Sequence, residues 1–442
     1  MSSEWKTFVL RDVASIIGGG TPSTKEATYW DGNIPWLTPK DLSSHTGMYV
    51  KRGERSITKA GLDGSSAKIV PPGTVLFTSR APIGYLAIAE QAISTNQGFK
   101  SLVLNTEQDN RFFYYLLRFH TPDIEAIATG STFKEISGSA LGSFEVTIPS
   151  YGEQTKIADI LTTLDDRIEL LRETNATLEA IAQALFKSWF VDFDPVRAKQ
   201  EGREPEGMDA DTAALFPDSF EESELGLIPK VWTVKCLRDI TNRITKGTTP
   251  TTLKRPFVAS GINFIKVESL TEDGEFIPGK FAYIDNETHE LLKRSQLQVD
   301  DVLITIAGTI GRIAVMTEDF LPANTNQAVA LIRPDPDRFP GGLIKHFLQR
   351  DDSRQNMVER VVQAVQANLS LGSISDLKVV VPPSKVVKQL YDAGISQIDA
   401  CKNRNQKHIR TLTNIRDTLL PRLISGQLRI PEAEALIEEA SA

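Results

Sequence analysis

Residues 157–189 read IADILTTLDDRIELLRETNATLEAIAQALFKSW. From Ile157 to Trp189, apolar residues recur in alternating steps of four and three, which is the spacing of a coiled-coil seam. At about 1.5 Å per residue, such a helix is roughly 50 Å long. A domain of about 150 residues needs no helix of that length for its own core. This stretch therefore predicts a long helix that packs against a second helix.

The same spacing returns near the end of the chain, from Tyr391 to Leu423. Two asparagines lie at seam positions, where a buried amide costs stability but disfavours wrong registers. We predict that the seam residues face one another between two antiparallel helices. The predicted seam comprises Leu161, Leu164, Ile168, Asn175, Leu178 and Leu185 of the first helix, and Ile398, Asn405, Ile409, Leu412 and Leu419 of the second.

Each helix follows one copy of an internal repeat. Trp5, with Arg11-Asp12-Val13 after it, recurs as Trp232 with Arg238-Asp239-Ile240, and Thr95-Asn96-Gln97 recurs unchanged as Thr325-Asn326-Gln327. Short β-rich runs mix with helical stretches in both copies, which favours compact α/β domains. The predicted fold is α/β (α+β), with two similar α/β domains joined by two long antiparallel coiled-coil helices in a pseudo-two-fold arrangement.

The predicted boundaries follow the repeats, the helices and a stretch rich in Pro and Gly between them. They are a first domain at 1–150, a first helical region at 151–194, a linker at 195–230, a second domain at 231–383, a second helical region at 384–428, and a C-terminal tail at 429–442.

Composition predicts a soluble cytoplasmic protein with no membrane partner. The 442 residues contain no apolar run of about 18 residues, and the two cysteines show no metal or redox spacing. The formal net charge is −8, but residues 151–229 alone carry 7 basic and 18 acidic residues. The two repeated domains are therefore close to neutral and can present basic faces to phosphates.

No catalytic or metal-binding motif is present. The loop Gly18–Thr24 lacks the lysine of a phosphate-binding P-loop, and the five histidines are scattered. The chain also lacks the Asp/Asn-Pro-Pro-Tyr/Phe tetrapeptide with which adenine methyltransferases grip a flipped base. We therefore predict no catalytic residue, no metal site and no cofactor bound by this chain.

Polar loops after equivalent strands of the two copies carry side chains suited to reading DNA. Arginine and lysine pair with guanine, asparagine and glutamine with adenine, and glutamate accepts a hydrogen bond from cytosine. The loops differ between the copies, which indicates one scaffold used twice with altered specificity. The predicted DNA-binding residues are Thr21, Thr38, Lys40, Ser79, Arg80, Asn96, Gln97 and Lys100 in the first copy, and Lys246, Thr248, Lys266, Glu268, Thr305, Arg312, Asn326 and Gln327 in the second.

Over its whole length the chain resembles the specificity subunit of type I restriction-modification systems. The resemblance is carried by the opening Trp5–Thr24, Asn33-Ile-Pro-Trp-Leu37, Ser94-Thr-Asn-Gln-Gly-Phe99, the stretch 185–199, the linker from Pro205 to Pro217, and Leu419-Leu-Pro-Arg-Leu-Ile-Ser-Gly426. It implies two target recognition domains that each read one half of a bipartite double-stranded DNA sequence. It also implies that the helices hold two methyltransferase subunits and that restriction subunits with translocase and nuclease activity join them. S-adenosylmethionine, ATP and Mg²⁺ would then serve those partners.

Apolar residues off the seam indicate where a partner subunit could bind. Phe186, Phe190, Leu420 and Ile424 have no place in a two-helix seam, and we expect the methyltransferase to cover them.

The predicted function is a non-enzymatic DNA specificity and scaffolding subunit with an asymmetric bipartite target. Two alternatives stay open at the level of sequence. One is a stand-alone adenine methyltransferase or restriction enzyme, which would bind S-adenosylmethionine by itself. The other is a coiled-coil adaptor without DNA function, whose complex would retain no specific duplex.

Overall fold

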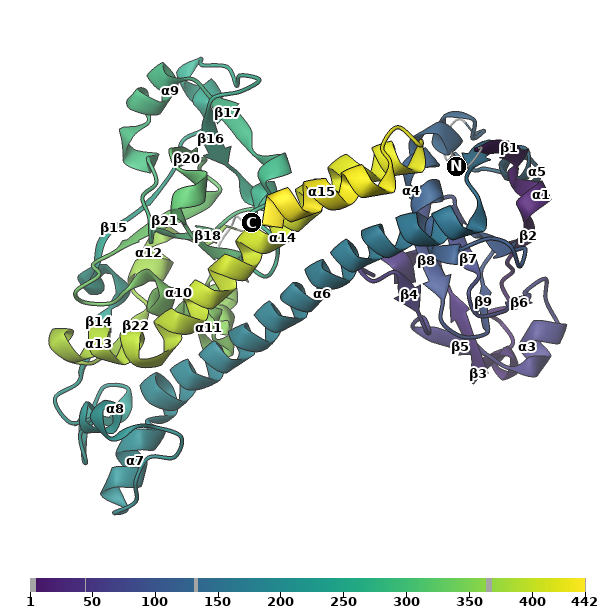
Figure 1. Ribbon diagram of the computed structural model, residues 1–442. Coiled ribbons are helices and arrows are strands. Elements are labelled where there is room, and N and C mark those ends of the chain that lie inside the picture. Colours follow the sequence, from purple (N-terminus) through teal and green to yellow (C-terminus); the bar gives the residue numbers. More distant parts are fainter. Residues whose placement is uncertain (1–4, 44, 131–133, 363–367, 442) are drawn as a thin grey trace. The chain divides into compact units, whose positions relative to one another are not determined.

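The computed structural model describes residues 5–43, 45–130, 134–362 and 368–441. The chain folds into two compact units. Unit 1 comprises Met1–Thr174 with Asn405–Ala442, and unit 2 comprises Asn175–Arg404. Each unit therefore contains one copy of the repeat and a portion of both long helices, α6 and α14 (Figure 1).

Unit 1 is built on two sheets. The five-stranded sheet has the order β2 (Ala14–Gly18), β10 (Lys100–Leu104), β7 (Val75–Ser79), β8 (Ile83–Ala89) and β4 (Tyr49–Val50). The four-stranded sheet has the order β5 (Arg55–Ile57), β3 (Trp30–Leu37), β9 (Ile93–Thr95) and β6 (Ile69–Val70). All five residues of β7 are buried, as expected of a central strand.

Unit 2 repeats this plan. One sheet has the order β15 (Thr241–Lys246), β21 (Val329–Pro334), β18 (Val302–Thr305) and β19 (Ile313–Val315), and the other has the order β17 (Ala282–Ile284), β16 (Ile262–Ile265) and β20 (Ala323–Thr325). In each unit a small antiparallel pair also joins the two ends of the domain: β1 (Lys6–Val9) with β11 (Glu145–Ile148), and β14 (Thr233–Cys236) with β22 (Lys378–Val381).

The strand register confirms the internal repeat. The parallel pair β3 and β9 places Leu37 beside Thr95, and the parallel pair β16 and β20 places Ile265 beside Thr325. Thr95 and Thr325 correspond in the sequence repeat, and Leu37 and Ile265 end the corresponding runs Pro35-Trp36-Leu37 and Asn263-Phe264-Ile265. The predicted α/β fold class with two similar domains and long helices is therefore confirmed.

The two long helices extend over the predicted stretches. Helix α6 spans Tyr151–Lys187 and continues as a π-helical turn at Ser188–Asp192. Helices α13 (Ser384–Leu390) and α14 (Ser396–Ile424) flank a second π-helical turn. In unit 1, Leu161 and Leu164 lie in one cluster with Leu419 and Leu423, whereas the later Ile168 packs with the earlier Ile409. This order makes the pair antiparallel.

In each unit, one helix of the domain contacts a long helix through a polar side chain. In unit 1, the Tyr115 hydroxyl on α4 (Asn110–Ala126) donates to Asp165 of α6 at 2.8 Å, and burial followed by the Asp165 charge raises the pKa of Tyr115. In unit 2, the imidazole of His346 on α10 (Gly341–Gln349) lies 3.4 Å from Asp399 of α14. The two carboxylates occupy equivalent places in the heptad spacing of their helices.

The segment predicted as a linker is folded. It contains α7 (Asp194–Gln200), α8 (Ala210–Ala214) and the hairpin of β12 (Phe220–Ser223) and β13 (Gly226–Pro229). Val196 and Phe216 are buried in the core of unit 2, where Phe216 lies 6.1 Å from Trp232 between ring centroids, and Ile228 is buried as well. Burial of these apolar side chains supplies the free energy that orders a segment rich in Pro, Gly and charge.

The predicted tail is also ordered, because α15 (Ile430–Ser441) buries Ala433 in the core of unit 1. Among the described residues, no helix is long and apolar enough to cross a membrane. The remaining α-helices are α1 (Leu10–Val13), α2 (Pro39–Ser43), α3 (Lys59–Asp63), α5 (Gly138–Gly142), α9 (Asn286–Leu291), α11 (Asp351–Val362) and α12 (Leu371–Ser375).

Candidate nucleic-acid interface

The predicted DNA-reading loops of unit 1 meet at the turn that follows β9. The Gly20 N–H donates to the Thr95 carbonyl at 2.9 Å, the Asn96 N–H donates to the Leu37 carbonyl at 2.8 Å, and the Ser79 N–H donates to the Gly98 carbonyl at 2.7 Å. The loops after β2, β3 and β7 are thereby joined to one turn. The turn recurs after β20 in unit 2, where Gly247 donates to the Asn326 carbonyl at 3.0 Å.

Glycine is required where the first loop approaches this turn. A β-carbon on Gly19 would overlap the Thr95 and Asn96 carbonyl oxygens, and one on Gly247 would overlap the Thr325 carbonyl. Since backbone atoms cannot move aside as a flexible side chain can, only glycine permits this approach.

The same side-chain bonds hold the turn in both units. The Thr21 hydroxyl donates to the Gln97 amide oxygen, and the Thr249 hydroxyl donates to the Gln327 amide oxygen. Thr249, which precedes Pro250 as Thr21 precedes Pro22, is therefore the counterpart of Thr21. The prediction named its neighbour Thr248 instead, whose hydroxyl accepts a bond of 3.1 Å from Arg294.

Three cationic residues predicted in unit 1 are engaged in ion pairs. Arg80 and Lys100 lie 3.1 and 3.6 Å from the Glu135 carboxylate, and Lys100 is only 16% exposed. Lys40 is 83% exposed and pairs with Glu54 at 3.3 Å. An exposed pair of this kind contributes about 0–1 kcal/mol and opens easily. Lys40 is thus available to a ligand. Arg80 is partly available, because its pair with Glu135 is 37% and 38% exposed, while the less exposed Lys100 is held by Glu135.

Thr38 lies at the end of β3 and is held by its own turn. Its hydroxyl and its N–H donate to Asp41 at 2.6 and 2.7 Å. Burial alone would raise the pKa of Asp41, but these bonds and the Glu54 N–H lower it below its ordinary value. Asp41 is therefore a charged anchor for the loop that presents Lys40.

In unit 2, the loop after β16 presents Lys266 and Glu268, which lie 2.6 Å apart. The hydrogen bond from Lys266 lowers the pKa of Glu268. The Lys266 ammonium also lies 5.9 Å from the centroid of the Phe257 ring. Lys246 is exposed at the end of β15.

Two predicted DNA contacts are wrong because their side chains are fully buried. Ser79 is 0% exposed, and its hydroxyl accepts a bond of 3.4 Å from Lys100. Thr305 is also 0% exposed, and its hydroxyl accepts the Arg312 N–H at 2.9 Å. The Thr305 hydroxyl stabilises the loop that leaves its strand, whereas Ser79 is bonded to Lys100 of β10, and neither buried side chain can reach a base.

The role predicted for Arg312 is also corrected. Its guanidinium donates to the carbonyls of Val267 and Leu270 at 3.3 and 2.7 Å, and the side chain is 21% exposed. Arg312 therefore ties the loop after β18 to the loop after β16. Because Nη1 holds both carbonyls and Nε is buried, a bidentate contact of Arg312 with guanine would require breaking the loop.

Sequence reasoning missed Glu135, Asp41, Thr249 and Arg294. The repeated Thr-Pro dipeptide could have identified Thr249, because Thr21-Pro22 aligns with Thr249-Pro250. Nothing in the sequence marks Glu135, which lies 55 residues from Arg80 in the chain.

Comparison with known proteins places this arrangement in a family. The model of the type I restriction modification DNA specificity domain matches residues 2–180 and 229–414, which are the two copies of the repeat with most of their helices. The chain belongs to the type I restriction-modification specificity family.

Relatives match over nearly the whole chain. The MjaIX specificity subunit of Methanocaldococcus jannaschii is 32% identical over 446 residues, which cover 97% of this chain and 94% of the relative. The HindI specificity subunit of Haemophilus influenzae is 27% identical, with 96% and 100% covered. The crystal structure of a type I system S subunit from M. genitalium is similar in fold, with a TM-score of 0.56 at 19% identity over 96% of each chain.

The residues predicted for the seam of this specificity subunit are buried or half-buried. Two charged residues that fall at the heptad spacing of the second helix, Lys402 and Arg416, have partners across the helix pair. In unit 1, Arg416 lies 2.6 Å from Asp165. In unit 2, Lys402 pairs with Glu179, and the Asn175 side chain donates to the Lys402 carbonyl at 3.3 Å.

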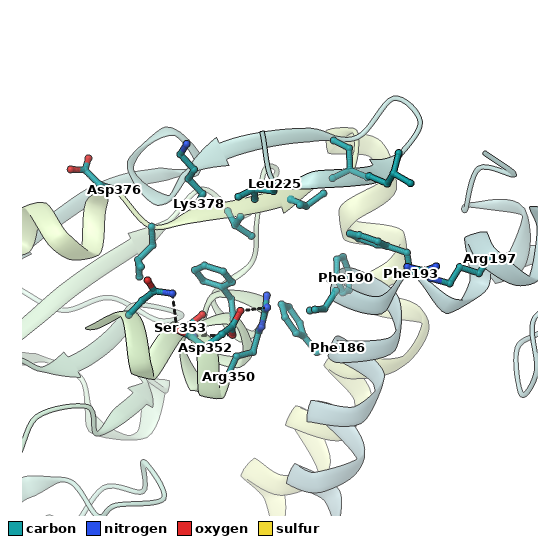
Figure 2. Close-up of a pocket in the computed structure, with 18 residues that line it drawn as sticks. Phe186, Phe190, Phe193, Arg197, Leu225, Arg350, Asp352, Ser353, Asp376 and Lys378 are labelled. Carbon is teal, nitrogen blue, oxygen red and sulfur yellow. Dashed lines mark hydrogen bonds and ion pairs between the residues drawn. The ribbon is translucent and has the colours of Figure 1, made fainter. Parts of the chain in front are cut away.

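The four predicted partner-binding residues are covered by the chain itself, which overturns the idea that the methyltransferase covers them. Phe186 and Phe190 are 1% and 3% exposed and stack at 5.1 Å within the core of unit 2. Figure 2 shows them on the wall of a pocket of about 480 Å³, with Leu225 of the β12–β13 hairpin across it. Leu420 and Ile424 are buried in the core of unit 1. The folded linker and the domains supply the apolar contacts that a two-helix rod alone would lack.

Within the described residues, no group of three histidine, cysteine or acidic side chains is placed to hold a metal ion.

Proposed function

We propose that this chain recognises an asymmetric, bipartite double-stranded DNA sequence, each unit reading one half-site. Its partners would be two methyltransferase subunits and restriction subunits with translocase and nuclease activity. Methylation with S-adenosylmethionine and cleavage with ATP and Mg²⁺ are assigned to those partners in the cytoplasm, and this chain supplies sequence specificity.

The observation that carries the proposal is a reversal of charge at one matched position. Lys40 lies three residues after Leu37 at the end of β3, and Glu268 lies three residues after Ile265 at the end of β16. Both side chains are exposed, at 83% and 53%. A lysine donates to guanine O6 or N7, whereas a carboxylate accepts from the cytosine amino group. Equivalent loops therefore present a cationic hydrogen-bond donor in one unit and an anionic acceptor in the other, which suits two half-sites of different sequence.

Mapping the methylated motif tests the proposal. The chain is expressed with its methyltransferase partner, and the host genome is sequenced for methylated adenine. Two different half-sites separated by a spacer are expected. A continuous motif or a perfect palindrome contradicts the proposal.

Reversing the charge in each loop shows which unit reads which half-site. K40E should alter one half-site only, and E268K should alter the other only. Lys59 provides a matched control in the same unit as Lys40. It is 84% exposed at the start of α3 and follows Ile57, which pairs with Trp30 at the opposite end of β3 from Lys40. K59E should leave the motif unchanged. A motif that stays the same in K40E and E268K would contradict a reading role for these loops.

A further inference from the structure

The turns after β9 and β20 are the feature that the two units share most closely. Thr95-Asn96-Gln97 and Thr325-Asn326-Gln327 are identical in sequence, and each glutamine accepts a hydrogen bond from a threonine of the preceding glycine loop. Both glutamines are exposed. The neighbouring loops differ, as the reversal from Lys40 to Glu268 shows. Side chains that are the same in both units cannot account for a difference between two half-sites.

The hydrogen bonds also limit what these amides can recognise. Bidentate reading of adenine requires both the oxygen and the nitrogen of one amide, because adenine offers the N6 donor beside the N7 acceptor. The glutamine oxygens accept from Thr21 and Thr249. The Asn96 oxygen accepts the Gly98 N–H at 2.8 Å, and the Asn326 oxygen accepts the Ala328 N–H at 3.1 Å.

Each amide oxygen is therefore used to hold its own turn. Each glutamine oxygen has used one of its two lone pairs on its threonine, whereas the Nε2 takes no part in these bonds and offers two donor hydrogens. Phosphate oxygens are acceptors at every step of a duplex, whatever its sequence, and contacts to them position a protein without specifying bases.

We propose that Gln97 and Gln327 bind phosphate oxygens of the DNA backbone, one in each unit, and that Thr21 and Thr249 are positioning residues that orient the amides. This inference rests on the proposed DNA-binding function. In this proposal Gln97 and Gln327 do not read adenine and instead make a contact that is independent of the DNA sequence. The loops that differ between the units, including those of Lys40 and Glu268, retain the reading of bases.

The test uses the chain assembled with its methyltransferase partner and two duplexes of equal length, one carrying the methylated motif and one with both half-sites scrambled. Q97L and Q327L should each weaken binding to both duplexes by a similar factor of about ten, as expected for one hydrogen bond to a charged acceptor. The methylated motif should stay the same. The dependence of affinity on salt should also be unchanged, because a neutral amide releases no counterion.

Variants at the threonines separate positioning from packing. T21V and T249V should weaken binding in the same way, and T21S and T249S should restore it, because serine keeps the donating hydroxyl. The matched control is Q91L. Gln91 is an exposed glutamine of unit 1 that donates to the Lys51 carbonyl at 2.7 Å, away from the shared turn, so its loss should not change DNA binding.

Two results would overturn the inference. One is a relaxed preference at a single base pair in Q97L or Q327L, which would make the glutamine a base reader. The other is unchanged affinity in both variants. A failure of the proposed function looks different, because the unmodified complex would then bind the two duplexes equally well.

Discussion

Replacing Glu179 with glutamine should destabilise unit 2 by about 3–5 kcal/mol, because this carboxylate pairs with two buried ammonium groups. Lys345 lies 2.8 Å from Glu179, and Lys402 also pairs with Glu179. The side chain of Lys345 is 11% exposed, that of Lys402 is 9% exposed and that of Glu179 is 21% exposed. At an effective dielectric constant of about 20, one pair at this distance attracts with roughly 6 kcal/mol, from which desolvation subtracts. Without the carboxylate the two ammonium groups repel each other.

The effect should depend on pH in a defined direction. Burial alone would raise the pKa of Glu179, but Lys345 and Lys402 hold it far below its ordinary value. A depressed pKa in the folded state contributes stability that is fully present above the unfolded value of about 4.3 and is lost as the pH falls toward the folded value. The difference between the native chain and E179Q should therefore be largest near pH 7 and shrink below about pH 4.

The loss of stability in E179Q can be measured by thermal unfolding and by hydrogen exchange of the backbone amides of α10. For a unit of this size the melting temperature should fall by on the order of 10 °C. E169Q is the matched control on the same helix, since Glu169 pairs with Arg172 at a more exposed site and should cost less than about 1 kcal/mol. The triple variant E179L/K345M/K402L should recover most of the stability, because apolar packing replaces the charges. An E179Q loss no larger than that of E169Q would refute the reasoning.

Three further predictions concern the loops and the seam. G247A should displace the first loop of unit 2, destabilise that unit by about 1–3 kcal/mol and weaken DNA binding. G18A should have none of these effects, because its β-carbon meets no atom within 4 Å. Melting temperature and retention of a DNA duplex check this, and a G247A variant that behaves like the unmodified chain would contradict it. R416M should lower the free energy of unfolding of unit 1, measured in urea, by about 3–5 kcal/mol, because it leaves Asp165 without its closest cation. A decrease below about 1 kcal/mol would show that the ion pair is not needed for stability. S79A should leave the methylated motif unchanged, because Ser79 is fully buried, and a changed motif would restore it as a base contact.

Some parts of this protein could be predicted because their signal repeats locally. Strands β7 and β18 overlap the β-rich runs at residues 74–77 and 302–306, and helices α4 and α10 contain the helical stretches at residues 112–119 and 343–348. The seam could be predicted for the same reason, since a spacing of 3.5 residues needs no knowledge of the partner helix. Individual site residues were predicted less well. Thr305 and Lys40 are both polar residues at strand ends, yet one is buried and the other is 83% exposed.

By itself the sequence determined that the chain repeats one α/β plan, that each copy feeds a long heptad helix, and that the chain belongs with type I specificity subunits. These properties depend on the order and period of residues along the chain. Tertiary structure alone decided that Glu179 pairs with Lys402, that Glu135 pairs with Arg80, that the threonines donate to the glutamine oxygens, and that Phe186 is covered by its own unit. Burial and hydrogen bonding depend on atoms from segments far apart in sequence, 223 residues apart for Glu179 and Lys402, and no local pattern encodes which segments will meet.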